Sequence, residues 1–103
     1  MQNNIEKRIE INELLRIYGA LLTKRQHDIL LRRYTDDLSF GEIAAEFDIT
    51  RQAVLNFENK AIRTLRKYEK RLGVYAREQK IKAMLEKTFV DEHARLALYE
   101  VFS

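Results

Sequence analysis

The side chains best suited to recognition chemistry in this sequence are polar residues of the kinds that contact nucleic acids. They fall within and just after the segment from Phe40 to Asn59, FGEIAAEFDITRQAVLNFEN. Arginine pairs with guanine edges, glutamine and asparagine pair with adenine edges, and threonine, lysine and helix-terminal amides contact phosphates. The candidate contact residues are Thr50, Arg51, Gln52, Asn56, Asn59, Lys60 and Arg63.

Two amphipathic stretches joined by a tight turn must position these side chains. Apolar residues spaced for one shared seam occur in both stretches: Ile43, Phe47, Ile49, Val54 and Phe57. Two helices that bury such a seam at a steep angle form a helix-turn-helix, which we expect over residues 39–60. Asp48 stands where the turn calls for a positive φ; Gly would adopt that conformation more easily, but Asp tolerates it.

The helix-turn-helix geometry also assigns roles to the polar residues. In this docking mode the N-terminal part of the second helix lies in the major groove and contacts base edges. The expected base contacts are Arg51, Gln52 and Asn56. The expected backbone contacts are Thr50, Lys60 and Arg63.

Two neighbouring residues favour a different partner. Leu55 suits a thymine methyl group or a groove on a protein equally well, and Glu58 would place a negative charge near the phosphates. A protein-interaction module that keeps the helix-turn-helix scaffold is therefore the alternative function. RNA is a third option, but the narrow A-form major groove excludes a helix, so RNA would be bound through its shape and phosphates.

The rest of the chain is expected to be helical as well. Its 103 residues include no Pro and three Gly, too few turn-forming residues for a hairpin-rich β fold. Apolar residues recur at helical spacing in successive stretches, over residues 5–21, about 24–34, 40–47, 51–72, 74–89 and 91–102. We predict an all-α protein with a helix-turn-helix domain over residues 1–72 and a C-terminal helical extension over residues 73–103.

Capping residues mark where several of these helices begin. Thr23 with Gln26, and Ser39 with Glu42, have the spacing of capping boxes. Thr50 is suited to cap the long helix that follows it.

Apolar stripes predict which helix faces are buried. In the first helix the stripe runs from Ile5 and Ile9 to Leu22, and in the helix over residues 51–72 it runs from Val54 to Leu72. Stripes of this kind let helices pack around one shared core.

Positive charge is concentrated in the middle of the chain. Residues 51–82 hold 10 Lys and Arg against 3 Asp and Glu, whereas the segments 1–50 and 83–103 each carry a balance of −2. This basic segment, within a chain of net charge +3, indicates a surface for a polyanion; a solvated helix face is the alternative. We expect nucleic acid as the partner and favour duplex DNA.

A family resemblance is carried by two stretches, LLTKRQHDILLRRYTDDLSFGEIAAEFDITRQAV over residues 21–54 and YEKRLGVYAREQK over residues 68–80. They resemble the YlxM family of bacterial helix-turn-helix proteins, which are encoded beside the genes for the signal recognition particle GTPases. Members of that family in turn look like the promoter-binding fourth region of sigma factors.

This resemblance implies a sigma region 4-like domain of the winged-helix-like superfamily that binds DNA or RNA in a regulatory role. It also implies components of the signal recognition particle pathway for protein targeting as partners. Its matched recognition positions are Arg51, Gln52, Ala53 and Val54. Glu58 departs from the family pattern, which tends to have an apolar residue there, so the resemblance fixes the contact residues only as far as Val54.

The segment after the motif has two possible uses. Between residues 60 and 82, Lys and Arg alternate with apolar residues, so this helix could follow phosphates beyond the groove or pair with a second copy of the chain. A two-fold dimer would present two recognition helices about one turn of DNA apart, roughly 34 Å. We favour the homodimer, with a tail folded back on its own domain as the alternative.

The composition argues against several other kinds of chemistry. Without Cys there is no disulfide, thiolate metal site or thiol nucleophile. His27 and His93 lack a second ligand at helical spacing, and neither a Gly-rich phosphate loop nor a serine elbow occurs. We therefore expect no metal, no cofactor and no enzyme activity. No apolar run approaches the about 20 residues of a spanning helix, and the first residues lack an apolar secretion segment, so a cytoplasmic protein is expected.

Overall fold

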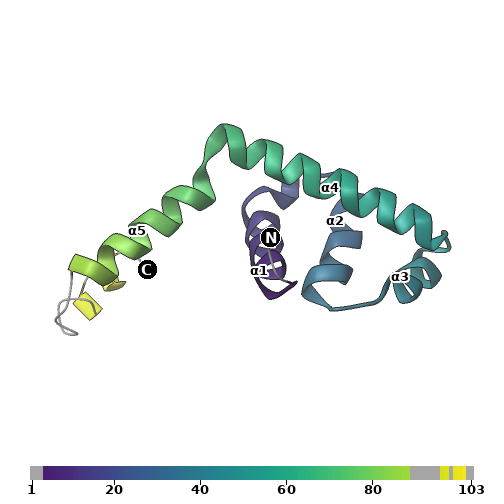
Figure 1. Ribbon diagram of the computed structural model, residues 1–103, viewed down its shortest axis with the longest axis horizontal. Helices are drawn as coiled ribbons and strands as arrows, with labels where there is room; N and C mark the ends of the chain where they lie inside the picture. The colour runs from purple at the N-terminus through teal and green to yellow at the C-terminus, as the bar shows by residue number, and fades with distance from the viewer. Residues whose placement is uncertain (1–3, 89–95, 98, 102–103) are drawn as a thin grey trace. The chain divides into compact units, whose positions relative to one another are not determined.

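A computed structural model describes residues 4–88, 96, 97 and 99–101 of the chain (Figure 1). All regular structure within these residues is helical, so the predicted all-α fold is confirmed. The chain divides into two compact units, residues 1–73 and residues 74–103. Within the described part of the chain, every helix is too short or too polar to cross a membrane.

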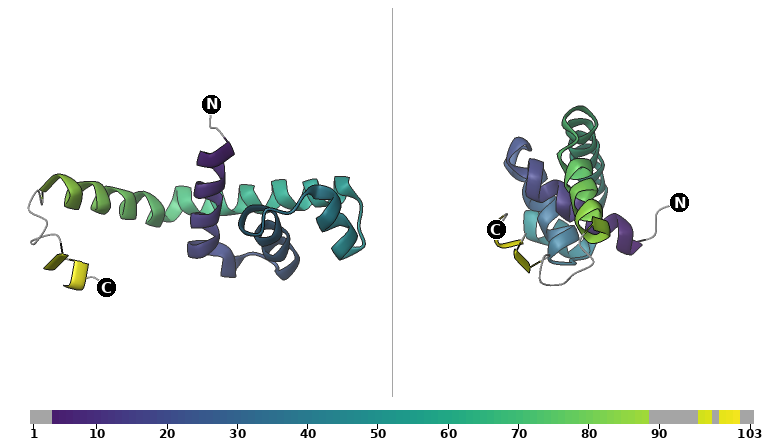
Figure 2. Two further views of the ribbon diagram at one scale, coloured as in Figure 1. Left: turned by 90° about the horizontal axis from the view of Figure 1, so that it is seen from below. Right: turned by 90° about the vertical axis from the view of Figure 1, so that its left-hand side faces the viewer.

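The first unit packs three helices against one side of a long fourth helix. α1 (Asn4–Tyr18), α2 (Lys24–Leu30) and α3 (Phe40–Phe47) all lie on the same side of α4 (Arg51–Leu72) (Figure 1). α1 crosses α4 steeply, as Figure 2 shows. The opposite side of α4 is left uncovered by the other helices of this unit.

The core of the first unit draws apolar residues from all four helices. Its largest fully buried side chains are Ile11, Leu14, Ile29, Leu30, Ile43, Val54 and Leu65. The predicted helix-turn-helix seam is confirmed, because Ile43 and Val54 are fully buried and the other three expected residues pack against them. Ile29 of α2 completes this cluster, a contribution that the sequence pattern did not assign.

Side-chain caps form at the expected helix starts. Both predicted capping boxes are present, at Thr23 and at Ser39. Thr50 Oγ1 accepts a hydrogen bond from the backbone N–H of Ala53 at 3.0 Å, which confirms the cap at the start of α4. Gly73 follows the end of α4 with a φ of 62°, a left-handed conformation that favours glycine.

The first two predicted helices each change helix type in their last turn. α1 stops at Tyr18 and the chain tightens into the 3₁₀ turn η1 (Gly19–Leu21). Glycine weakens a helix, and a Cβ at Gly19 would lie 3.1 Å from Cδ2 of His27, so the lack of a side chain lets α2 approach closely. α2 continues as one π-helical turn, η2 (Leu31–Thr35).

The apolar stripes are also shorter than predicted. Ile5 and Ile9 of α1 are exposed, because α1 crosses α4 and only its later residues reach the core. Leu72, the last residue of α4, is exposed as well. A stripe is therefore buried only where a neighbouring helix covers it.

The second unit begins with α5 (Val74–Thr88), in which no residue is buried. Leu96, Ala97 and residues 99–101 are also helical. The rest of the helix predicted over residues 91–102 lies outside the described residues, as does His93.

Candidate nucleic-acid interface

The turn between α3 and α4 sets the direction of the second helix. Asp48 has a φ of 55° and a ψ of 49°, so the predicted left-handed residue is confirmed. The backbone N–H of Ile49 donates to the carbonyl oxygen of Ala44 at 3.0 Å, which ties the turn back to α3. These local bonds fix where α4 begins and which of its faces is turned outward.

The predicted contact residues all lie at the surface of α4 or of its cap. Gln52, Asn56, Asn59 and Arg63 follow one another at steps of three or four residues, so they form a single row along the helix. Thr50 and Arg51 stand at the start of this row, and Lys60 lies beside it. Although the Thr50 oxygen accepts the capping bond, its hydroxyl proton can still be donated to a phosphate.

The two amides expected to contact bases are bonded to each other. Nε2 of Gln52 donates to Oδ1 of Asn56 at 3.1 Å. This bond leaves the Gln52 carbonyl oxygen to accept and the Asn56 amide nitrogen to donate. An acceptor beside a donor matches the N6 amino group and N7 that adenine presents in the major groove.

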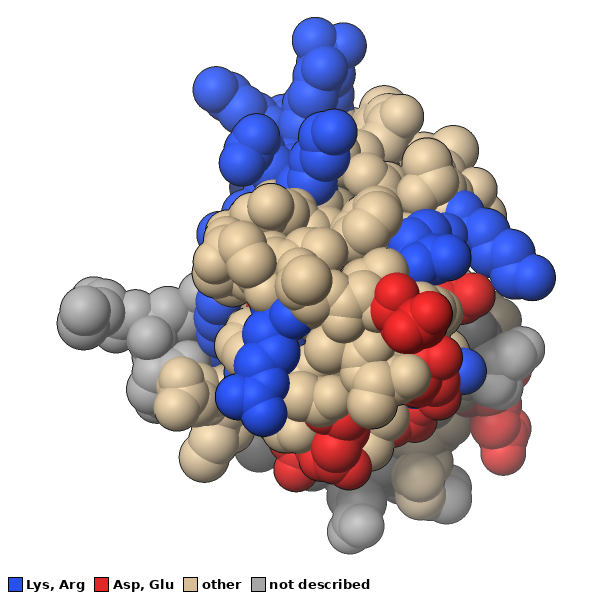
Figure 3. Space-filling view, turned by 90° about the vertical axis from the view of Figure 1, so that its right-hand side faces the viewer, with Lys and Arg blue, Asp and Glu red and all other residues tan. Residues whose placement is uncertain are grey.

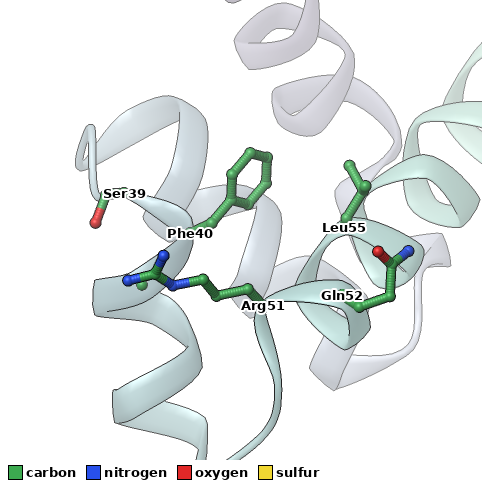
Figure 4. A pocket seen from close by; sticks show the side chains of 6 residues that line it. Ser39, Phe40, Arg51, Gln52 and Leu55 are labelled. Atoms are coloured by element: carbon green, nitrogen blue, oxygen red, sulfur yellow. The ribbon is translucent and has the colours of Figure 1, made fainter.

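Arg51 reaches back from α4 toward the start of α3, where Ser39 and Phe40 lie (Figure 4). A Cβ on Gly41 would be only 2.9 Å from Nη2 of Arg51, so the glycine makes room for the guanidinium. An open pocket of about 410 Å³ surrounds it, lined by Ser39, Phe40, Gly41, Arg51, Gln52 and Leu55. Arg51 forms no ion pair with another described residue, so its charge faces this pocket uncompensated.

Glu58 lies on the buried side of α4, contrary to the expectation from sequence that its charge would lie near the phosphates of a bound nucleic acid. Its side chain points inward and the residue is only 4% exposed. Oε1 of Glu58 accepts a hydrogen bond from the Tyr34 hydroxyl at 2.5 Å. Burial, together with the adjoining Glu58 carboxylate, raises the pKa of Tyr34 above its ordinary range, so the hydroxyl keeps the proton that it donates.

The other carboxylate of α4 is engaged in the same way. Glu69 accepts a hydrogen bond from the Tyr18 hydroxyl at 2.7 Å, and the rings of Tyr18 and Tyr68 stack with their centroids 6.1 Å apart. Both acidic side chains of α4 thus bond to tyrosines of the elements that pack against it. Glu58 therefore does not favour a protein partner over a nucleic acid.

The outer surface of α4 is left with uncompensated positive charge. Arg66 pairs with Glu10 of α1 at 2.8 Å. No ion pair to another described residue forms at the remaining cations of the helix, which are Arg51, Lys60, Arg63, Lys67, Lys70 and Arg71. Figure 3 shows a cluster of Lys and Arg at the top of one face of the molecule, further Lys and Arg at its right and lower left, and Asp and Glu in its lower half.

Lys7 is a neighbour of the row that sequence reasoning missed. It lines one hollow together with Asn59 and Arg63, although it belongs to α1. The segment 1–50 has a balance of −2, so its charge gave no signal. Only the packing of α1 across α4 brings Lys7 to this place.

The described histidine has a local partner. A ring nitrogen of His27 lies 3.2 Å from a carboxylate oxygen of the adjacent Asp28. Among the described residues, no three His, Cys, Asp or Glu side chains are grouped to hold a metal ion.

In the first unit, four helices pack together and a tight turn joins α3 to α4, whose outer side is polar and exposed. This arrangement defines a helix-turn-helix protein. Residues 5–100 match the family model described as "Putative helix-turn-helix protein, YlxM / p13 like". The chain belongs to this family, UPF0122, which confirms the resemblance to the YlxM proteins seen in the sequence.

Relatives from several bacteria carry the same family name. A UPF0122 protein of Lacticaseibacillus casei is 45% identical over 75 residues, which are 73% of this chain and 66% of that protein. A UPF0122 protein of Exiguobacterium sibiricum is 38% identical over 82 residues, covering 80% of this chain and 77% of the relative. The chain thus spans just under two thirds of the length of the first of these relatives.

Proposed function

We propose that this chain binds duplex DNA through α4 and acts as a regulator rather than as an enzyme. The N-terminal turns of α4 enter the major groove, where Arg51, Gln52 and Asn56 contact base edges. Thr50, Lys60 and Arg63 contact the sugar-phosphate backbone. Asn59 lies in the same row and completes the contact surface.

One observation carries this proposal. The outer side of α4 combines base-pairing amides near its start with uncompensated cations along its length, while both carboxylates of the helix bond to tyrosines. A helix of 22 residues is about 33 Å long, and the major groove is about 12 Å wide. The first turns therefore suit base contact, and the later cations suit phosphates beyond the groove.

Duplex DNA suits this arrangement better than RNA does. The deep, narrow major groove of an A-form helix does not admit an α-helix, so the amides at the start of α4 could not reach base edges there. Competition by an RNA duplex of the same sequence provides a direct test, and we expect it to displace labelled DNA only weakly.

The central experiment compares two triple variants by mobility shift on duplex DNA. The first, Arg51→Ala, Gln52→Ala and Lys60→Ala, removes proposed contacts. The control, Arg77→Ala, Gln79→Ala and Lys80→Ala, removes the same residue types from exposed positions of α5. Because one bidentate base contact contributes about 1–3 kcal/mol, we expect the first variant to lose at least about tenfold in affinity and the control to stay near the wild type.

Two outcomes would contradict the proposal. Unchanged binding by the first triple variant would show that α4 is not the contact helix. A wild-type affinity that does not fall with rising salt would exclude phosphate neutralisation, and with it DNA binding of this kind.

We also propose that two copies of the chain form a homodimer through α5. Ile81 and Met84 of α5 are exposed apolar side chains, which a second copy could cover. The double variant Ile81→Glu and Met84→Glu would place charges in that contact, so sedimentation equilibrium should show a dimer for the wild type and a monomer for the variant. A monomeric wild type would exclude this partner.

A place in signal recognition particle-dependent targeting stays a prediction from the family resemblance. The cytoplasmic location stays a prediction from the sequence, which lacks long apolar segments. Capture of partners from a cell extract, with and without nuclease, tests both the pathway and the rival protein-interaction function. Targeting components that stay bound after nuclease treatment would favour a direct protein contact.

A further inference from the structure

A groove with several basic side chains lies between α1 and α4, at the edge of the helix-turn-helix motif. Two hollows of about 320 and 330 Å³ adjoin there, and Lys7 and Asn59 line both of them. The second hollow is completed by Ile62, Arg63 and Arg66. Every polar side chain in it can donate a hydrogen bond, and three of the four carry a positive charge.

Two of these charges come from different helices and form no ion pair with a described carboxylate. Arg66 is neutralised by Glu10 at 2.8 Å. Lys7 on α1 and Arg63 on α4 form no ion pair with another described residue. The groove therefore holds two cations that can each bind an anionic group.

The position of Lys7 is supported from beneath. Its Nζ lies 5.9 Å from the centroid of the Tyr34 ring, within the range of a cation–π contact. The Tyr34 hydroxyl is bonded in turn to the buried Glu58 of α4 at 2.5 Å. The ring under Lys7 is thus fixed to the same helix that carries Arg63.

The groove is continuous with the proposed DNA contact and lies on one flank of it. On the opposite flank of α4, a hollow of about 220 Å³ is lined by Ala53, Asn56, Phe57 and Lys60. Lys7 therefore lies on one side of the polar row of α4 and Lys60 on the other, as phosphates lie on both sides of a major groove.

We propose that Lys7 binds a backbone phosphate of the DNA next to the one that Arg63 contacts, so that α1 adds a contact from outside the helix-turn-helix. This inference rests on the proposed function, since it adds one phosphate to the same interface. A phosphate contact positions the protein without reading sequence, so Lys7 contributes to affinity for any duplex.

The test measures affinity for a labelled duplex by fluorescence anisotropy between about 50 and 200 mM salt. Lys7→Ala is compared with Lys24→Ala, which removes an exposed lysine from the start of α2, and with Lys7→Arg, which keeps the charge. One lost phosphate contact changes the salt slope by about 0.9, so the advantage of the wild type over Lys7→Ala should shrink about 3.5-fold across this range. Lys24→Ala and Lys7→Arg should keep the wild-type slope.

The outcomes separate this inference from the proposed function. A steep wild-type slope that Lys7→Ala leaves unchanged would overturn the α1 contact and leave α4 as the interface. An affinity loss that is equal at all salt concentrations would assign Lys7 a purely structural role and overturn the contact as well. A wild type that fails to bind duplex DNA would overturn both. Circular dichroism confirms that each variant is folded before its affinity is compared.

Discussion

α4 and α5 are both basic amphipathic helices, yet only α4 has a buried apolar stripe. Val54, Ala61 and Leu65 of α4 are fully buried. In α5 no residue is buried, and Met84 is 65% exposed. The comparison shows that an amphipathic pattern predicts a helix with an apolar face but does not say what covers that face.

The two helices also differ in how their acidic residues are used. In α4, Glu58 and Glu69 accept hydrogen bonds from tyrosines of the same unit, which leaves the opposite side of the helix positively charged. α5 also carries two acidic residues, Glu78 and Glu86, but neither is buried.

The largest expected effect comes from the buried stripe of α4. Leu65→Ala should lower the free energy of unfolding by about 2–5 kcal/mol, because it leaves a cavity where the side chain is fully buried. The matched change Met84→Ala in α5 should alter it by no more than about 0.5 kcal/mol. Urea denaturation of both variants at low protein concentration measures the difference. Equal losses in the free energy of unfolding would contradict the conclusion that only α4 has a buried apolar stripe.

The next effect concerns the tyrosine that bonds to Glu58. Tyr34→Phe leaves the buried Glu58 carboxylate without this donor, so we expect a loss of about 1–3 kcal/mol. Tyr99→Phe, at an exposed tyrosine of the second unit, should have little effect.

The same tyrosine predicts a pH dependence. Its pKa is raised in the folded protein, so above pH of about 10 the unfolded chain loses a proton that the folded chain keeps. The contribution of Tyr34 to the free energy of unfolding is therefore fully present below a pH of about 10. It falls as the pH rises further, by at most about 1.4 kcal/mol per pH unit. The difference between wild type and Tyr34→Phe should show this slope in denaturation curves, whereas a Tyr99→Phe protein should retain it.

The smallest expected effect is a change in the salt dependence of DNA binding, which compares the exposed lysines of α4 with those of α5. Lys67→Ala with Lys70→Ala should reduce the salt dependence of DNA binding by up to about 1.8 in slope, or about 0.9 for each phosphate contact removed. Lys80→Ala with Lys82→Ala removes the same charge from α5. If the α5 double variant reduces the salt slope more than the α4 double variant does, the phosphate contacts lie on the second unit and not on α4.

Features that depend on nearby residues could be predicted from the sequence alone. The caps at Thr23, Ser39 and Thr50 and the left-handed Asp48 all follow from contacts within a few positions of the chain. The helix-turn-helix seam was predictable for the same reason, because Ile43 and Val54 belong to two helices joined by one short turn. The exposure of the polar row on α4 follows from burying that seam.

Tertiary packing decided what lies on the flanks of this row. Glu58 is buried because Tyr34, 24 positions earlier, donates to it, and a sequence pattern along one helix cannot reveal such a partner. Lys7 lies beside Asn59 and Arg63 only because α1 crosses α4. The local sequence thus determined the helices, their ends and the outward face of α4, whereas long-range packing decided which charges that face retains.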